Sequence, residues 1–102
     1  MLGPERQSKS YGAITRVLEA TLKQPLNLTS ILQSTRMSYL EGQEYVDYLC
    51  NLGLLESMLL FTGSRDLGSK TRVYWTSYRG KLVLAHIEAM KRLVQRDDLV
   101  VP

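Results

Sequence analysis

The apolar residues near the start of the chain recur at helical spacing. Between residues 10 and 23 they are Tyr11, Ile14, Val17, Leu18, Ala20 and Leu22. At 3.6 residues per turn, most of them share one side of a helix. Ser10 has the side chain of an N-cap residue, and Pro25 cannot continue a helix. The pattern predicts a first helix at about 10–23.

Two more helices are predicted before residue 54. A short one lies in SILQSTR at 30–36, where Asn27 or Thr29 can cap it. The third begins after Ser38, which has Glu41 at capping-box spacing, and it ends at Gly53, which suits a left-handed cap. The apolar stripe of this third helix consists of Tyr45, Val46, Leu49, Cys50 and Leu52.

The pattern then changes to that of strands. The runs LLESMLLF at 54–61 and TRVYWTSY at 71–78 are rich in branched and aromatic residues, and the turn TGSRDLGSK separates them. These runs predict a two-stranded hairpin. A last helix is predicted at about 77–96, and its broad apolar stripe contains Val83, Leu84, Ile87, Met90, Leu93 and Val94.

These elements fit one domain of the α+β class. A chain of 102 residues can form a single core. We expect a flexible arm at 1–9, a folded domain at 10–96 and a tail at 97–102. The composition, 44% hydrophobic and 23% charged, is that of a globular protein. The first residues lack the apolar run of a signal peptide, which predicts a cytoplasmic location.

Few residues suit catalysis or metal binding. Cys50 is the single cysteine and His86 the single histidine, so the usual four-ligand Cys/His site cannot be assembled within one chain. The sequence contains no glycine-rich phosphate loop and no GxSxG or HExxH motif. We therefore expect no enzyme activity and no cofactor. Cys50 is interpreted as a core residue, with a redox-sensing thiol as the alternative.

Charge is divided unevenly along the chain. Residues 37–62 contain four acidic and no basic side chains, whereas residues 63–81 contain five basic and one acidic. Three of the basic residues, Arg65, Lys70 and Arg72, belong to the turn and second strand of the predicted hairpin. They indicate either an anionic partner or a turn that basic residues keep soluble.

Two stretches resemble a known family. MSYLEGQEYVDYLCNLGLLE resembles the recognition-helix segment of small archaeal winged helix-turn-helix regulators from chromosomes, plasmids and viruses. Its matching positions are Met37, Ser38, Tyr39, Tyr45, Val46, Leu49, Gly53, Leu54 and Leu55. The later stretch YWTSYRGKLVL is similar to that family's second signature, through Tyr74, Thr76, Gly80 and Lys81. The similarity covers residues 10–96 and departs at Gly42, where the family usually has a leucine. It implies a winged helix-turn-helix fold, in which the hairpin is the wing and the C-terminal helix dimerises.

On this fold, the expected partner is double-stranded DNA. The wing residues Arg65, Lys70 and Arg72 would contact phosphates, which give affinity without specificity. Specificity would come from the third helix and the turn before it, where the candidates are Arg36, Ser38, Tyr39 and Gln43. Glu41 and Glu44 either accept hydrogen bonds from bases or complement the helix dipole. An acidic third helix also suits a winged helix that binds protein.

The last helix is predicted to form a homodimer interface. The residues of this interface are Val83, Ile87, Met90, Leu93 and Val94, because a small domain cannot cover so broad a stripe. Alternatively, the tail RDDLVVP folds back over it. A dimer would present two recognition helices to a palindromic site. The leading hypothesis is a dimeric, sequence-specific transcriptional regulator, and the alternatives are a protein-interaction module and a sequence-neutral architectural DNA binder.

Overall fold

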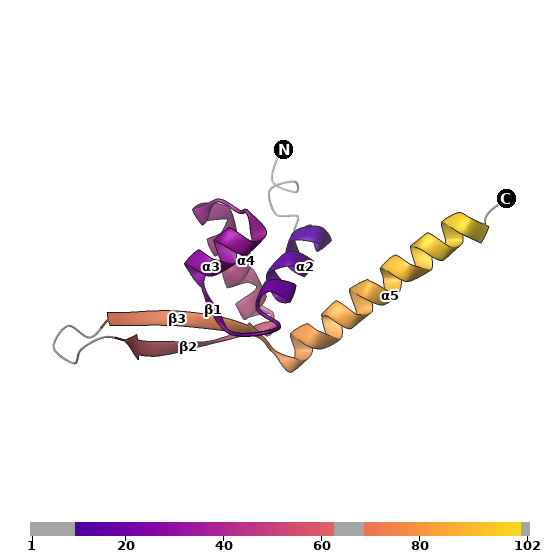
Figure 1. The fold of residues 1–102 in the computed structure, drawn as a ribbon. Coiled ribbons are helices and arrows are strands. Elements are labelled where there is room, and N and C mark those ends of the chain that lie inside the picture. Colours follow the sequence, from indigo (N-terminus) through magenta and orange to yellow (C-terminus); the bar gives the residue numbers. More distant parts are fainter. Residues whose placement is uncertain (1–9, 63–68, 101–102) are drawn as a thin grey trace.

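The computed structural model describes residues 10–62 and 69–100. The chain combines helices with a small antiparallel sheet in a mixed α+β fold (Figure 1), which confirms the predicted class. In chain order the elements are α2 (Tyr11–Ala20), β1 (Leu26–Asn27), α3 (Leu28–Thr35), α4 (Tyr39–Asn51), β2 (Leu55–Thr62), β3 (Ser69–Thr76) and α5 (Tyr78–Val100). Helix α5 continues past residue 96 to Val100, so part of the predicted tail is helical. Residues 1–9, predicted to be an arm, and residues 101–102 lie outside the described residues.

Side-chain caps fix where the first three helices begin. The Ser10 hydroxyl oxygen accepts from the backbone N–H of Ala13 at 3.1 Å. The Asn27 side chain accepts from Ser30 at 2.9 Å, so Asn27 rather than Thr29 caps the second helix. The Ser38 hydroxyl oxygen accepts from the N–H of Glu41 at 3.2 Å. Each cap satisfies a donor that has no partner within its own helix.

Two glycines fit α4 into the fold. Gly53 has a φ of 78° and ends the helix, and the next residue, Leu54, donates its N–H to the Leu49 carbonyl at 2.9 Å, as in a Schellman cap. Gly42 is buried, and a Cβ there would overlap the Leu32 side chain of α3. The departure from the family pattern therefore allows α3 and α4 to pack closely, and α4 is helical from Tyr39 onward in spite of it.

The sheet has three antiparallel strands in the order β1-β3-β2. Strands β2 and β3 pair from Leu55 opposite Thr76 to Thr62 opposite Ser69. The prediction of two strands was incomplete, because β1 pairs its two residues with β3, Leu26 opposite Tyr74. A two-residue strand is too short to show alternation, so no local pattern along the chain indicates β1.

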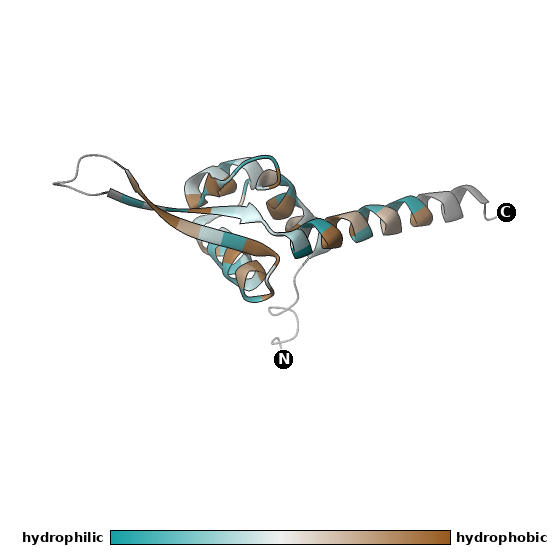
Figure 2. Cartoon of the chain, turned by 90° about the horizontal axis from the view of Figure 1, so that it is seen from below, coloured by the Kyte–Doolittle hydropathy of each residue, from teal (hydrophilic) through white to brown (hydrophobic). Residues whose placement is uncertain are grey.

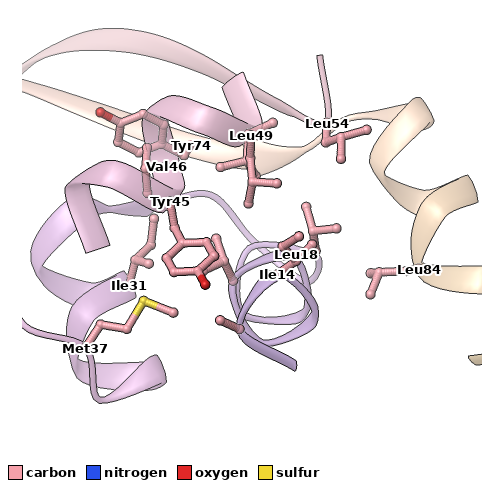
Figure 3. Close-up of a cluster of buried hydrophobic side chains, with 13 residues drawn as sticks. Ile14, Leu18, Ile31, Met37, Tyr45, Val46, Leu49, Leu54, Tyr74 and Leu84 are labelled. Carbon is pink, nitrogen blue, oxygen red and sulfur yellow. The ribbon is translucent and has the colours of Figure 1, made fainter. Parts of the chain in front are cut away.

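The core lies between the first three helices and one face of the sheet. Helices α2, α3 and α4 are all on this side of the sheet (Figure 1). Val17 and Leu18 from α2, Ile31 from α3, and Val46 and Leu49 from α4 are 0% exposed. Tyr74 of β3 and Leu84 of α5 join the same cluster (Figure 3). The core therefore fixes the base of the hairpin and the first turns of α5 against the helices.

A buried pair of hydroxyl groups links α2 to the end of β3. The Thr76 hydroxyl donates to the Leu18 carbonyl at 2.6 Å, and it lies 2.8 Å from the Thr21 hydroxyl oxygen. Thr21 and Thr76 are 0% and 4% exposed. The Thr21 hydroxyl also lies 3.0 Å from the Val17 carbonyl. These bonds satisfy the carbonyls where α2 ends, which water cannot reach.

Replacing Thr76 by valine is expected to destabilise the protein by about 1–3 kcal/mol, because the isosteric side chain leaves buried acceptors without a donor. Urea unfolding followed by circular dichroism measures the change. Thr15→Val is the matched control, since Thr15 is also buried but bonds only the Tyr11 carbonyl of its own helix. If both substitutions lower the free energy of unfolding equally, the hydrogen bonds between α2 and β3 contribute no more than a bond within one helix.

Helix α5 extends away from the rest of the chain. Its first turns pack on α2, but its later turns project from the body (Figure 1). The radius of gyration is 16.6 Å, whereas a compact domain of about 100 residues has a value of about 13 Å. None of the helices within residues 10–62 and 69–100 combines the length and the hydropathy that a membrane span requires.

Candidate nucleic-acid interface

The wing, formed by β2 and β3, has two faces of different character. Side chains alternate along each strand, and Leu55 and Tyr74 are buried in the core beneath the helices. The residues that share their face farther along the wing are Leu59, Phe61, Lys70 and Arg72. We call this the helix-side face. The opposite, outer face contains Met58, Leu60, Val73 and Trp75, and the Trp75 indole donates to Glu56 at 2.9 Å.

The two described wing cations are exposed on the helix-side face. The Arg72 guanidinium donates to the Ser57 hydroxyl across the strands at 2.9 Å. The Lys70 ammonium lies 5.5 Å from the centre of the Phe61 ring, within the range of a cation–π contact. Both cations are therefore accessible to an anion. Arg65, the third predicted phosphate contact, lies outside the described residues.

The predicted base-reading residues lie at the start of α4 and in the turn before it. Tyr39 is 65% exposed. Arg36 is also exposed and has a φ of 60°, so this residue makes the left-handed turn between α3 and α4. The hydroxyl oxygen of Ser38 is used in the cap, although its O–H remains able to donate. Gln43 is half-buried, and its amide nitrogen donates to the Asp47 carboxylate at 3.2 Å.

The wing and α4 belong to one surface. Burial raises the pKa of the Cys50 thiol in α4, the Asp47 carboxylate raises it further, and Arg72 of the wing lowers it. Burial likewise raises the pKa of Tyr74, with opposing contributions from Cys50 of α4 and from Arg72. Helix α4 also packs against β2, the strand that pairs with β3. A thiol whose pKa is raised stays protonated at neutral pH, which disfavours a redox-sensing role for Cys50.

Acidic side chains accompany these candidates on α4. Glu41, Glu44 and Asp47 are exposed, and Glu41 lies in the first turn, where it complements the helix dipole. Carboxylates are repelled by DNA phosphates. The cations among the candidate residues are therefore those of the wing and Arg36, while α4 offers mainly hydrogen-bond acceptors.

Sequence reasoning missed the exposed apolar residues of the wing. Phe61 is 72% and Leu59 41% exposed, and both share the helix-side face with the cations. Figure 2 shows the contrast between the apolar end of β2 and the hydrophilic start of β3. Alternation within LLESMLLF and TRVYWTSY could have placed these residues beside Lys70 and Arg72, but only once the strand register was known.

An open groove of about 800 Å³ runs along α5. It lies between α5, the start of α2 and the end of α4, and its apolar lining includes Tyr11, Ile14, Leu52, Ile87, Met90 and Val94. Val83 also lines it and is half-buried, and Met90 and Val94 are 46% and 59% exposed. Ile87 is only 8% exposed, so it packs largely within its own chain. Leu93 is 61% exposed but does not line the groove.

The described residues offer no metal site. Among residues 10–62 and 69–100, no three His, Cys, Asp or Glu side chains gather closely enough to hold an ion. His86 is exposed and lines the groove beside α5. The groups that the described surface offers to a partner are therefore cations on the wing, hydrogen-bond acceptors on α4, and apolar side chains on the wing and α5.

Comparison with known proteins places this arrangement among winged helices. No protein-family model and no curated protein matches the sequence. A PadR family transcription regulator from hypervirulent Clostridium difficile R20291 is similar in structure, with a TM-score of 0.72 and 15% identity over 85% of this chain and 93% of that one. Sso10a-2, a DNA-binding protein from Sulfolobus solfataricus, has a TM-score of 0.59 and 18% identity over 92% and 99%.

The adhesin competence repressor AdcR from Streptococcus pyogenes is also similar, with a TM-score of 0.63 and 14% identity over 99% of this chain and 74% of that one. The three proteins are regulators or DNA-binding proteins rather than enzymes. Identities this low establish the fold alone. The chain therefore has the winged helix-turn-helix fold of these transcription regulators.

Proposed function

We propose that this protein binds double-stranded DNA sequence-specifically, as a dimeric transcriptional regulator in the cytoplasm. The observation that carries the proposal is the pair of exposed wing cations, Lys70 and Arg72, on the face of the hairpin on whose base α4 packs. In a winged helix this surface can place a helix in the major groove while the wing contacts the backbone. Similarity to DNA-binding regulators supports the same partner.

The wing and α4 have separate tasks in this proposal. Lys70, Arg72 and Arg65 contact phosphates and hold the protein on the duplex. Arg36, Ser38, Tyr39 and Gln43 meet the major groove. Because a carboxylate only accepts hydrogen bonds, the Gln43 amide turns its nitrogen to Asp47 and keeps its carbonyl oxygen for a partner. This acceptor, like the Glu41 carboxylate, matches the donors of adenine N6 and cytosine N4.

The dimer is proposed to form through α5. A second copy of α5 would fill the groove beside the first, covering Met90 and Val94, with Val83, Ile87 and Leu93 completing or bordering the contact. The same patch on both copies gives a two-fold contact. The projection of α5 from the body supports this arrangement, because its later turns have no partner helix within the described chain. Two α4 helices would then read a palindromic site.

Selection of binding sites from random duplex DNA tests the proposal. Wild-type protein is expected to enrich a palindromic motif. The double substitution Lys70→Ala/Arg72→Ala is expected to weaken binding to all sequences, and to reduce the slope of log K against log salt by about 2, because two phosphate contacts are lost. Gln43→Ala is expected to change the motif instead, at a cost of about 1–3 kcal/mol at one base position. Ala89→Gln, on the exposed surface of α5, is the control.

A sequence-neutral architectural DNA binder is the second candidate. The exposed carboxylates of α4 favour it, since they oppose entry of this helix into a groove. In that case no motif is enriched, Gln43→Ala has no effect, and the wing substitutions still weaken binding. The third candidate, a protein-interaction module, is favoured instead if the wild-type protein does not bind duplex DNA at about physiological salt.

A further inference from the structure

The exposed apolar residues on the helix-side face of the wing are paired with cations. Leu59 lies directly opposite Arg72, and Phe61 directly opposite Lys70. An apolar strip along β2 therefore lies beside a basic strip along β3. Contacts to phosphates require cations and hydrogen-bond donors, so they do not account for the apolar strip.

Phe61 is the most exposed residue of this strip. Its side chain is 72% exposed, whereas Leu59 is 41% exposed. Phe61 also lies farther along β2, away from the helices that cover the base of the sheet. Exposure of an aromatic ring to water is unfavourable, and here the Lys70 ammonium 5.5 Å from the ring centre offsets part of that cost.

We propose that Phe61 is an apolar wedge that enters the minor groove of duplex DNA, partly unstacks a base step and bends the duplex. This inference rests on the proposed DNA-binding function and adds a mechanism to it. In several proteins that bind the minor groove, a phenylalanine or another apolar side chain separates stacked bases, while neighbouring cations hold the backbone. Phe61 shares one face of the wing with Lys70 and Arg72, so the apolar side chain and the cations that such binding requires lie side by side.

The positive charges of Lys70 and Arg72 indicate that the partner of this surface is DNA. The cations lie immediately beside the apolar strip, and in a duplex the phosphates lie immediately beside the sugars and base edges of the groove. When DNA binds, the Lys70 ammonium moves from the Phe61 ring to a phosphate. The face of the ring is then free to enter the minor groove. The outer face has no such pattern, because Met58 and Leu60 lie opposite the neutral residues Val73 and Thr71.

The test measures DNA bending separately from affinity. A duplex of about 30 base pairs, with a fluorescent donor and acceptor at its ends, reports the bend by energy transfer, and 2-aminopurine within it reports unstacking. Wild-type protein is expected to bend the duplex by roughly 20–90°. Phe61→Ala is expected to bind about tenfold more weakly and to leave the bound DNA nearly straight. Phe61→Leu, which keeps an apolar wedge, is expected to restore part of the bend.

Leu60→Ala is the matched control, because Leu60 adjoins Phe61 but lies on the outer face and is 39% exposed. It is expected to bend DNA as wild type does. A straight duplex with bound wild-type protein, or an unchanged bend with Phe61→Ala, would overturn the wedge but leave DNA binding intact. Tighter binding of single-stranded than of duplex DNA would also overturn it. If the wild type binds no DNA, the proposed function fails together with the wedge.

Discussion

Replacing Gly80 by alanine is expected to destabilise the protein by about 3 kcal/mol or more, although alanine is the better helix former. A Cβ at this position would overlap the backbone carbonyl of Leu54 and lie 2.7 Å from the Thr76 Cγ2 atom. Neither atom can move away easily, because Ser77 donates its N–H to the same Leu54 carbonyl at 3.0 Å, and the Thr76 side chain is held by the bond from its hydroxyl to the Leu18 carbonyl. The junction of β3 and α5 would have to open. For a domain of this size the thermal midpoint would fall by roughly 15 °C.

Thermal unfolding at one fixed protein concentration measures this effect, and Gly12→Ala is its control. Gly12 is an exposed residue in the first turn of α2, where an added Cβ would meet only the Ser10 Oγ at 3.5 Å and an end of the Arg16 side chain at 4.0 Å. Alanine there is expected to stabilise the protein by about 0.4–1 kcal/mol, chiefly because it reduces the conformational entropy of the unfolded chain. If Gly80→Ala unfolds at the wild-type temperature, the packing of α5 against Leu54 is looser than described.

Placing glutamate at both Met90 and Val94 is expected to convert a dimer into a monomer and to weaken DNA binding about 100-fold or more. The proposed contact would bury both side chains against a second α5, and a carboxylate buried there without a partner is strongly unfavourable. A monomer also loses the advantage of holding its two recognition helices on one duplex, which is worth about 10²–10⁴ in affinity.

Sedimentation equilibrium measures the mass, which should fall from twice 11.6 kDa to 11.6 kDa. Ala89→Glu adds a carboxylate to an exposed residue of α5 that does not line the groove, so this variant should remain dimeric. A wild-type protein that is monomeric at micromolar concentration, or a double variant that stays dimeric, would refute the contact along α5.

The elements that the sequence predicted well are those with local causes. Ser10 and Ser38 form hydrogen bonds three residues ahead, and Gly53 ends its helix through its own φ angle. Such interactions depend on neighbouring residues, so the pattern along the chain is sufficient to find them. Strand β1 was missed because its partner, β3, lies more than forty residues away in the sequence.

The candidate site was less predictable because it depends on register and packing. The apolar residues of α5 fall into two groups. Leu84 and Ile87 are buried within the chain, whereas Met90 and Val94 are exposed along the groove. Hydrophobic spacing alone does not separate these two groups. Likewise, no feature of the sequence around Phe61 shows that it lies opposite Lys70, because that contact follows from the pairing of β2 with β3.

The bond between Trp75 and Glu56 has a practical consequence. Trp75 is the only tryptophan of the chain, and it is half-buried on the outer face of the wing, where its indole donates to Glu56. Its fluorescence therefore reports on the hairpin, whereas circular dichroism at 222 nm reports mainly on the helices. Loss of the two signals at different urea concentrations would reveal a wing that unfolds before the helical core, in unlabelled wild-type protein.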